Sequence, residues 1–433
     1  MCDEAACGTA YLDRLIAPQS ADHFVRNVWG LRPLLVPGHT TKWRELFDND
    51  LGIETFEALA DLHLKQGQPL IAFLPLDSNQ ISHNDFNPQK VSVSSKEDMV
   101  RLYSIGSTIV IPFCERFLPK LARVITRIKA DLSFVGNVKC SMWWSRSGSG
   151  SGLLPHFDPR INIFKVQVSG TRHWRLASTL QPNIERYAGG GIRPDGVAVL
   201  KSLDGTQVIE RDPVAMDMEL DLSAGDLLYM PSGTWHTTVG SSDDESISVN
   251  LSFQDDTFKD FFYKGVIDGL GVPDFAVDVP IAYKAPDGKL PEDVRDRLRA
   301  SLQHFADYMT GFSDADLEAL WNRSIAQQRV PQAGLTAQKT IRRPRPDDTF
   351  LTAPGAVMRY WIDGDRVTLV SGTQSVSLDK KYRPVCEQLV VVPSVSAKEV
   401  MVWSGQPWAD VAVLLEELLV KRLLYAKDPW VRL

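Results

Sequence analysis

His156-Phe157-Asp158 decides the fold, together with a distant stretch that runs Gly225-Asp226-Leu227-Leu228-Tyr229-Met230-Pro231-Ser232-Gly233-Thr234-Trp235-His236. Alternate residues of a strand project to the same side, so His156 and Asp158 can bind one ion together. The second stretch predicts a turn, a short apolar strand, another turn and a further strand that carries His236. Two imidazoles and one carboxylate on one face of a metal are the ligand set of non-haem Fe(II) oxygenases. The sequence therefore predicts an iron centre built on β-strands from His156, Asp158 and His236.

The alternative interpretations of these residues are structural. A His-x-Asp triplet also occurs by chance, as a turn or a surface polar pair, and His236 could be a structural histidine beside Trp235. The two turns that frame His236 form a rarer pattern than the triplet alone. They favour the metal site.

Composition describes an ordinary globular chain with room for two or three domains, since 44% of its 433 residues are hydrophobic and 23% are charged. The net charge of −7 argues against a general nucleic-acid-coating role. The five cysteines have no metal-type spacing, and their odd number argues against a disulfide framework, so free thiols in a reducing compartment are expected. The N-terminus lacks a signal-peptide pattern and no stretch is apolar enough to span a bilayer, so a cytoplasmic location without membrane contact is expected.

Short strands punctuated by turns dominate the middle of the chain, which is typical of a sandwich or barrel. The predicted strands are 138–144, 162–168, 173–177, 218–222, 227–230, 235–239 and 247–253. Residues 1–95 mix helical patterns with short strands and predict a wrap around this core. Two segments, the Ser/Gly-rich 145–152 and the long insertion 178–215 with its run of three glycines, are predicted as loops that could cover a substrate.

Helical patterns return after Phe253, at 292–309 and from Ser313 towards Gln328, and these helices could pair subunits. The second helix has a start like a capping box, Ser313-Asp314-Ala315-Asp316. An extended linker is predicted at 331–354. The last part predicts strands at 357–362, 366–370 and 390–392 and a helix at 410–423 with five inward residues, which fits a small winged-helix-like module. Those five residues are Val411, Leu414, Leu415, Leu418 and Leu419. From Leu335 onward, 14 Lys and Arg against 11 Asp and Glu do not indicate a DNA-reading surface, so a protein-contact role is favoured.

Further motifs link the chain to a known family. They are Trp29-Gly30-Leu31-Arg32-Pro33-Leu34-Leu35, Gln167-Val168-Ser169-Gly170-Thr171-Arg172-His173-Trp174 and Ser246-Ile247-Ser248-Val249-Asn250-Leu251. With them, nearly the whole chain resembles JmjC-type Fe(II)/2-oxoglutarate oxygenases of the cupin superfamily, in the ribosomal-protein hydroxylase branch. The resemblance implies a mainly β fold with helical additions. We expect a double-stranded β-helix (jelly-roll or cupin) core with an N-terminal helical wrap at 1–255, a helical dimerisation region at 256–334 and a C-terminal winged-helix-like domain at 335–433.

The resemblance also assigns cofactors and binding residues, namely Fe(II), the cosubstrate 2-oxoglutarate, and O₂. Arg172 stands where relatives place a Lys or Arg for the far carboxylate of 2-oxoglutarate, and a guanidinium can bind a carboxylate through two parallel hydrogen bonds. Lys165 is either an alternative cation for this cosubstrate or a residue that meets the substrate. Asn162 and Asn250 match positions that contact the cosubstrate or substrate in relatives, although either could be a structural amide.

Two local features bear on which residues face inward. The stretch between Asp158 and Gly170 is one residue longer than in relatives, which demands a β-bulge and leaves the inward residues there open. Trp143 and Trp144 are adjacent on a strand, so one should pack in the core and the other can line the cleft.

The resemblance implies hydroxylation of a C–H bond in a protein or peptide side chain, with a ribosomal protein as the substrate in relatives, by a homodimer. Nucleic acid is not indicated as a partner. Two alternatives use the same chemistry, an N-methyl-lysine demethylase and a tailoring hydroxylase of a biosynthetic peptide or small molecule. A cupin-fold metal-binding regulator is the non-enzyme alternative.

Overall fold

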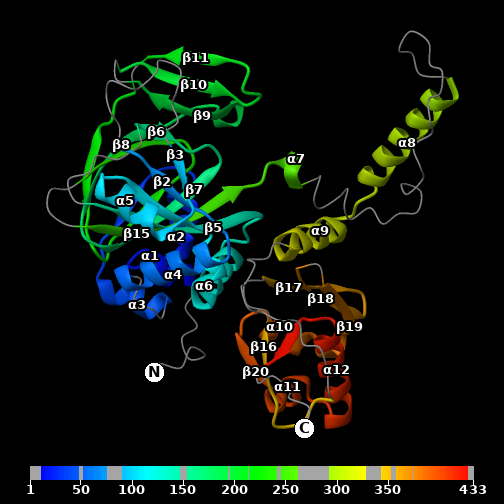
Figure 1. Cartoon of the computed structure of the whole chain (residues 1–433). Coiled ribbons are helices and arrows are strands. Elements are labelled where there is room, and N and C mark those ends of the chain that lie inside the picture. Colours follow the sequence, from blue (N-terminus) through cyan, green and yellow to red (C-terminus); the bar gives the residue numbers. More distant parts are fainter. Residues whose placement is uncertain are drawn as a thin grey trace. The chain divides into compact units, whose positions relative to one another are not determined.

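The computed structural model describes residues 11–47, 52–75, 90–146, 154–193, 196–212, 214–240, 245–261, 292–327, 343–352, 357–372 and 374–427. These residues form two compact units that divide at Asp255, and each unit is described by itself (Figure 1). Within these ranges no helix is both long and apolar enough to cross a membrane. The predicted loop 145–152 falls largely, and the linker 331–354 mostly, outside the described residues.

Two antiparallel sheets form unit 1, which confirms the expected mainly β fold with helical additions. One has eight strands in the order β1-β13-β7-β15-β5-β4-β2-β3, and the other has seven in the order β11-β10-β9-β6-β14-β8-β12. The bounds are β1 Leu34–Val36, β2 Leu70–Phe73, β3 Lys90–Val93, β4 Thr108–Pro112, β5 Gly136–Ser145, β6 His156–Phe157, β7 Ile161–Ser169, β8 Arg172–Leu180, β9 Tyr187–Ile192, β10 Ala198–Ser202, β11 Val208–Arg211, β12 Met218–Leu222, β13 Leu227–Met230, β14 Thr234–Gly240 and β15 Ser246–Asp255. Every strand predicted between 138 and 253 is present.

The two sheets pack face to face through an apolar cluster. Ile163 on β7 and Met230 on β13 come from the eight-stranded sheet, while Trp174 and Leu176 on β8 come from the other. Because successive strand residues point to opposite faces, the neighbours Phe164 and Val166 point away from the second sheet and into another core.

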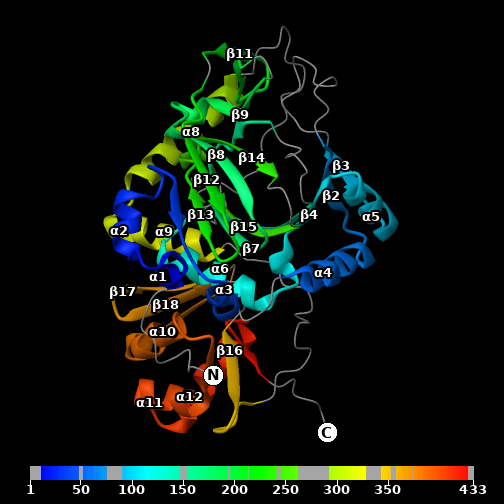
Figure 2. The same ribbon diagram turned by 90° about the vertical axis from the view of Figure 1, so that its left-hand side faces the viewer.

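Helices cover that outer face of the eight-stranded sheet (Figure 2). Their bounds are α1 Tyr11–Ile16, α2 Ala21–Asn27, α3 Thr40–Phe47, α4 Ile53–Lys65, α5 Lys96–Ser104 and α6 Pro119–Asp131. Phe24 of α2 contacts the rings of Phe164 and Tyr229 at centroid distances of 5.7 and 4.9 Å, and Trp29 stacks on Tyr229 at 5.6 Å. Aromatic burial of this kind fixes the outer face of the sheet, so the inner face is left for the site.

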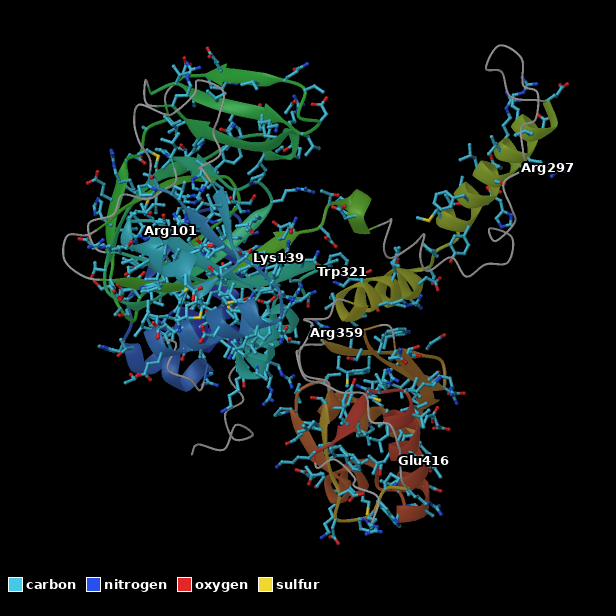
Figure 3. All side chains as sticks on the ribbon, in the orientation of Figure 1. Arg101, Lys139, Arg297, Trp321, Arg359 and Glu416 are labelled. Carbon is cyan, nitrogen blue, oxygen red and sulfur yellow. The ribbon has the colours of Figure 1, made fainter. Side chains whose placement is uncertain are left out.

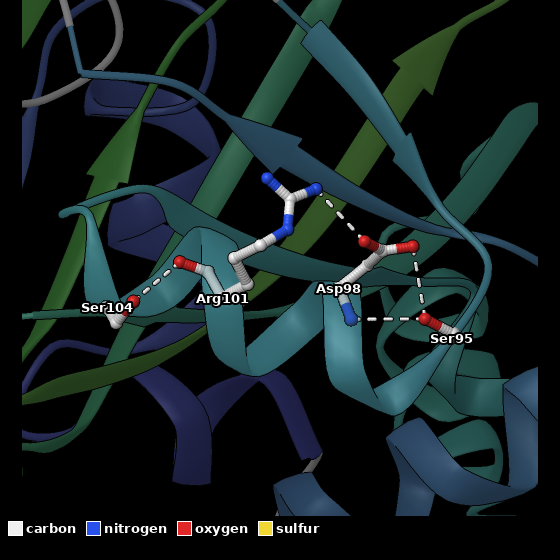
Figure 4. A network of polar contacts seen from close by, with 4 residues as sticks. All are labelled: Ser95, Asp98, Arg101 and Ser104. Atoms are coloured by element: carbon white, nitrogen blue, oxygen red, sulfur yellow. Dashed lines mark hydrogen bonds and ion pairs between the residues drawn. The ribbon is translucent and has the colours of Figure 1, made fainter.

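Helix α5 is held by a local polar network (Figure 4). Ser95 Oγ accepts the Asp98 backbone N–H at 3.0 Å, and the Arg101 guanidinium donates to the Asp98 carboxylate at 3.0 Å. Such a cap satisfies a backbone donor that the first turn leaves open. The capped helix presents Tyr103, whose ring stacks on Trp144 of β5 at 3.7 Å.

The insertion 178–215 is not a plain loop, which corrects the sequence prediction. It contains the three strands β9, β10 and β11, at the top of unit 1 in Figures 1 and 2. Gly190 and Gly191 pair with Phe157 and His156 of β6. A Cβ on Gly190 would lie 2.5 Å from Phe157 Cε1 and 2.8 Å from the Val199 carbonyl oxygen, so glycine allows this close strand approach. A glycine run has no apolar alternation, and the pattern therefore hid a strand.

The predicted β-bulge is present in β7. Ser248 of β15 pairs with Gln167, but its neighbour Ile247 pairs with Ser169, so Val168 is the extra residue. The bulge lies at the far end of the strand. Upstream of it, Ile163 and Lys165 share the inward side.

The described part of unit 2 contains helices α7 to α9 before its first strand, helices α10 to α12 among its later strands, and two three-stranded antiparallel sheets of order β20-β16-β21 and β17-β18-β19. The bounds are α7 Phe258–Phe261, α8 Glu292–Thr310, α9 Asp314–Gln327, β16 Thr349–Thr352, β17 Met358–Asp363, β18 Arg366–Ser371, β19 Gln374–Asp379, α10 Arg383–Leu389, β20 Ser394–Ser396, α11 Ala397–Ser404, α12 Trp408–Val420 and β21 Leu424–Ala426. All five predicted inward residues of α12 are buried. Figure 3 marks Trp321 on α9 and Arg297 on α8.

Two local predictions in unit 2 can be compared with the structure, the cap at the start of α9 and the strand at 390–392. Ser313 Oγ accepts the Asp316 N–H at 3.3 Å, and the Asp316 carboxylate accepts the Ser313 N–H at 2.9 Å, which is the reciprocal cap that the sequence predicted. The predicted strand at 390–392 is wrong, because this valine run is a turn that ends α10, with the Val390 N–H donating to the Cys386 carbonyl. The strand β20 begins two residues later.

Candidate metal centre

The three predicted ligands converge on the inner face of the seven-stranded sheet. His156 on β6 and His236 on β14 are direct antiparallel partners, with ring centroids 4.4 Å apart. Asp158 follows β6, and its Oδ2 lies 3.9 Å from His236 Nε2. One ligand atom from each residue lies within 4.8 Å of the others, which is the spacing for a single ion.

Backbone carbonyls orient both imidazoles. His156 Nδ1 hydrogen-bonds to the Leu154 carbonyl at 2.7 Å, and His236 Nδ1 to the Thr234 carbonyl at 2.9 Å. A carbonyl can only accept, so each Nδ1 donates and each Nε2 keeps its lone pair for a metal. Burial, and then the charge of His156, lowers the pKa of His236 to about 4, which keeps this imidazole neutral. This donor set fits Fe(II).

A pocket extends from the ligands between the two sheets. It is lined by Lys165 on β7, Arg172 and Trp174 on β8, and Asn250 on β15. Further polar lining comes from Thr108, Ser145 and Ser248. The strand alternation explains the set, because Arg172 and Trp174 share the inward side of β8 while His173 and Arg175 face outward, beside Asp221 and Glu219.

Two cations are therefore buried in one pocket. Lys165 and Arg172 are each 6% exposed. Burial lowers the pKa of Arg172 to about 10, so the guanidinium stays protonated at neutral pH. Burial, and then the charge of Arg172, lowers the pKa of Lys165. A pocket of this kind suits an anionic ligand.

The two asparagines have different surroundings. Asn250 lines the pocket, and its buried Oδ1 has no hydrogen-bond partner among the described residues. Asn162 points to the opposite side of β7, where its amide donates to Asp255 at 2.7 Å and its Oδ1 accepts the Tyr229 hydroxyl at 2.9 Å. It lines neither cavity described here. These contacts favour the structural alternative for Asn162.

The adjacent Trp143 and Trp144 point to opposite faces of the sheet, as strand geometry requires. Trp143 faces inward, lines the pocket and stacks on Phe73 at 5.3 Å with an interplanar angle of 4°. Trp144 points to the outer face and is 7% exposed. The rim of the cleft is therefore aromatic.

A larger cavity of about 950 Å³ adjoins the pocket and is lined by the ligands His156 and Asp158 as well. The insertion forms one wall of it through Ala188, Gly189 and Gly190 of β9, with Lys201 and Val208 from the two following strands. Ile163, Trp143 and Asn250 line both this cavity and the pocket between the sheets. This cavity is the candidate substrate site.

Sequence reasoning predicted Asn250 but missed the serines beside it on β15, of which Ser248 and Ser252 line the cavities. Ser246, Ser248, Asn250 and Ser252 alternate with the buried Ile247, Val249, Leu251 and Phe253. Ser246 and Ser248 are themselves buried. A strand with one apolar and one small polar face, both buried, is the signal that could have identified these residues.

A second cluster of metal-type side chains lies inside the helical core. Cys114 and Cys140 have their Sγ atoms 3.2 Å apart, and Glu115 accepts the Cys140 N–H at 3.0 Å. Both cysteines are buried free thiols, as predicted. Neither cavity reaches them. The sequence separation of the two cysteines hid this contact.

Comparison with known proteins agrees with the geometry. Residues 116–261, which include all three ligands, match the family model of the JmjC domain. The chain contains a JmjC domain. The JmjC resemblance predicted from the motifs is thereby confirmed.

Named relatives extend the likeness beyond this domain. Ribosomal oxygenase 2 of Bos taurus is 23% identical over 81% of this chain and 71% of its own length. The bifunctional lysine-specific demethylase and histidyl-hydroxylase NO66 of Drosophila willistoni is 29% identical over 42% of this chain and 24% of its own length. The ribosomal oxygenase YcfD of Escherichia coli, solved with cobalt and 2-oxoglutarate, is 15% identical, with a TM-score of 0.57 over 95% of this chain and 99% of its own. At this identity the likeness is one of fold.

Proposed function

We propose that the chain is an Fe(II)- and 2-oxoglutarate-dependent dioxygenase that hydroxylates a C–H bond of a protein or peptide side chain. The observation that carries the proposal is that a metal-ligand triad, two buried cations and a large cavity lie together in one site. Two imidazoles and a carboxylate meet at single-ion spacing, two buried cations lie in the adjoining pocket, and a large cavity opens beside them. YcfD, solved with cobalt and 2-oxoglutarate, has the same fold and supports this choice of cosubstrate.

Fe(II), bound with 2-oxoglutarate and O₂, supplies the oxidation of the C–H bond, with succinate and CO₂ as coproducts. His156, Asp158 and His236 would hold the metal through atoms already oriented by backbone carbonyls. Arg172 would receive the far carboxylate of 2-oxoglutarate, with Lys165 as the other cation of the pocket. Asn250, with its open Oδ1, would contact the cosubstrate or the substrate.

The protein also shields the site from water. Ile163 and Met230, which belong to the apolar cluster between the sheets, line the pocket. Burial strengthens each charge–charge contact, since little water screens it.

N-methyl-lysine demethylation is the second candidate, because NO66 is named as both a demethylase and a hydroxylase. The same oxidation of an N-methyl carbon releases formaldehyde. Mass spectrometry of peptide libraries and proteome digests, incubated with wild type or His156→Ala, separates the reactions. A gain of one oxygen supports hydroxylation, and loss of a methylene supports demethylation.

Substrate identity sorts the remaining candidates. The ribosomal oxygenase relatives favour a ribosomal protein, whereas a modified biosynthetic peptide or small molecule in the same screen would identify a tailoring enzyme. If no substrate is modified and no succinate is formed, the remaining candidate is a cupin-fold metal-binding regulator.

We also propose a domain organisation, a dimer and a cellular location for the chain. Exposed apolar side chains on α8 and α9, including Leu302 at 68% exposure, support a helical dimerisation region within 256–334. The two small sheets and three helices of 343–427 support a winged-helix-like domain in 335–433. The free thiols of Cys114, Cys140 and Cys386 are compatible with a cytoplasmic location.

A further inference from the structure

The larger cavity has a charge pattern that the metal centre does not explain. Apart from the metal ligands, the charged side chains that line it in the described part of the chain are two lysines, Lys90 and Lys201. Both are exposed, so they lie where the cavity opens to solvent. Asp158 is the one acidic residue among the described lining residues, and it is committed to the metal. Neither lysine has a carboxylate partner among the residues that the structure describes.

Strand register places Lys201 on the same face as the metal ligands. His156 on β6 pairs directly with Gly191 on β9, and Gly189, two residues along β9, pairs directly with Lys201 on β10. Cross-strand partners and alternate residues share one face of a sheet, so His156, Gly189 and Lys201 all face the cavity. Two strand spacings of about 4.8 Å and two residues of about 3.4 Å put the Cα atoms of His156 and Lys201 roughly 12 Å apart.

The wall between the metal ligands and Lys201 is nearly bare backbone. A Cβ on Gly189 would meet no atom within 4 Å, so the cavity is open there, whereas a Cβ on Gly190 would meet Phe157 on the other face. The Lys201 side chain extends to the turn at Gly205, where its Nζ lies 4.0 Å from the place that a Cβ would take. An extended segment can therefore lie against the glycine backbone and span from the metal to this ammonium.

Lys90 reaches the same cavity from the eight-stranded sheet. It pairs with Phe73 of β2, whose ring stacks on Trp143 at 5.3 Å, and all three residues line the cavity. The two lysines thus come from different sheets and contribute positive potential to one space. Such a cavity attracts an anionic group and repels a cationic one.

We propose that the oxidised peptide segment carries an aspartate or glutamate whose carboxylate binds Lys201 and Lys90. This inference rests on the proposed oxygenase function and names the chemical class of its substrate, an acidic segment. A separation of roughly 12 Å corresponds to about three to four residues of an extended chain, so the acidic residue lies at that distance from the oxidised one. A basic segment is disfavoured, because its cations would meet the two ammonium groups.

The test is a binding selection from a random nonapeptide library with amidated C-termini, so that any bound carboxylate comes from a side chain. Immobilised protein, loaded with Mn(II) and 2-oxoglutarate, retains peptides that mass spectrometry then sequences. Wild type is compared with Lys201→Gln, Lys90→Gln, the double variant and Lys201→Arg, which keeps the charge. Lys65→Gln, at an exposed position of α4 that lines neither cavity, is the matched control. A second library with free C-termini tests the terminal carboxylate as the source.

Exposed charge pairs are individually weak, so we expect wild type to enrich Asp and Glu over Asn and Gln by about three-fold. Lys201→Arg and Lys65→Gln should keep this preference, each single Gln variant should reduce it, and the double variant should lose it. The same library, incubated with Fe(II)-loaded wild type, 2-oxoglutarate and O₂, gives the spacing. Asp or Glu should be enriched three to four positions from the residue that gains an oxygen.

Equal retention of acidic and neutral peptides by wild type, a preference for Lys and Arg, or no retention above blank resin would overturn the inference. So would an acidic preference that persists in the double variant, because the carboxylate would then bind elsewhere. A preference confined to the library with free C-termini would overturn the side-chain assignment.

Succinate formation separates this inference from the proposed function. If wild type forms succinate from 2-oxoglutarate but shows no acidic preference, the acidic-substrate inference fails alone. If wild type forms no succinate, the proposed function fails and this inference fails with it.

Discussion

Glu115 carries the clearest pH-dependent contribution to stability. It is 2% exposed and lies beside Cys114 and Cys140 in the helical core, and burial raises its pKa from 4.5 to about 7. In the unfolded chain the carboxyl ionises near 4.5, whereas in the folded chain it stays protonated until about 7. The unfolded state therefore gains stability as the pH rises through this interval, and the folded protein loses it.

The size of the effect follows from the interval. At about 1.4 kcal/mol per pH unit, ionisation of Glu115 costs the folded state on the order of 3 kcal/mol by pH 8. Glu115→Gln removes the ionisation and keeps a carbonyl that can accept the Cys140 N–H. We expect its free energy of unfolding, relative to wild type, to rise by about 3 kcal/mol between pH 4.5 and pH 8.

Chemical denaturation at a series of pH values, followed by tryptophan fluorescence, measures this difference. Glu57→Gln, at an exposed position of α4, is the control for general effects of removing a carboxylate. A difference between Glu115→Gln and wild type that stays constant with pH would refute the reasoning. So would a difference that falls as the pH rises.

Two further substitutions test how the core supports the metal site. Gly190→Ala should lower the free energy of unfolding by about 1–3 kcal/mol and weaken Mn(II) binding, because the new Cβ meets Phe157 beside His156. Electron paramagnetic resonance titration measures the Mn(II) affinity. Unchanged binding and stability would contradict the packing argument. Tyr229→Phe should cost about 1–3 kcal/mol with Mn(II) affinity unchanged, because the hydroxyl accepts the Gly30 N–H at 2.8 Å and donates to Asn162. Urea denaturation checks the second variant, and a loss of metal affinity there would place Asn162 nearer the site than its contacts indicate.

The local sequence pattern was sufficient to predict the strands that carry the metal ligands. The ligands lie on strands whose alternation and flanking turns are visible in the sequence, so the meeting of His156 and His236 could be predicted from the sequence. The same rules predicted the inward residues of α12 and the cap at Ser313. Each of these features depends on neighbours that are close in the chain.

Sequence reasoning fell short where contacts between distant segments decide the outcome. Gly190 belongs to a strand because β6 and β10 pair on either side of it, which a glycine run does not reveal. Asn162 faces the outer core because the bulge lies downstream of it at Val168, a position that sequence length alone could not fix. The pairing of Cys114 with Cys140 likewise depends on how the segment that carries Cys114 meets β5.

Isotope transfer from O₂ tests the central claim most directly. The Fe(II)-loaded protein is incubated with 2-oxoglutarate under heavy-isotope O₂, and the mass of the succinate formed is compared with that from His236→Ala. An Fe(II)/2-oxoglutarate oxygenase predicts that wild type forms succinate carrying one heavy oxygen atom and that the variant forms none. Absence of succinate from wild type, or succinate without the heavy atom, would contradict the account.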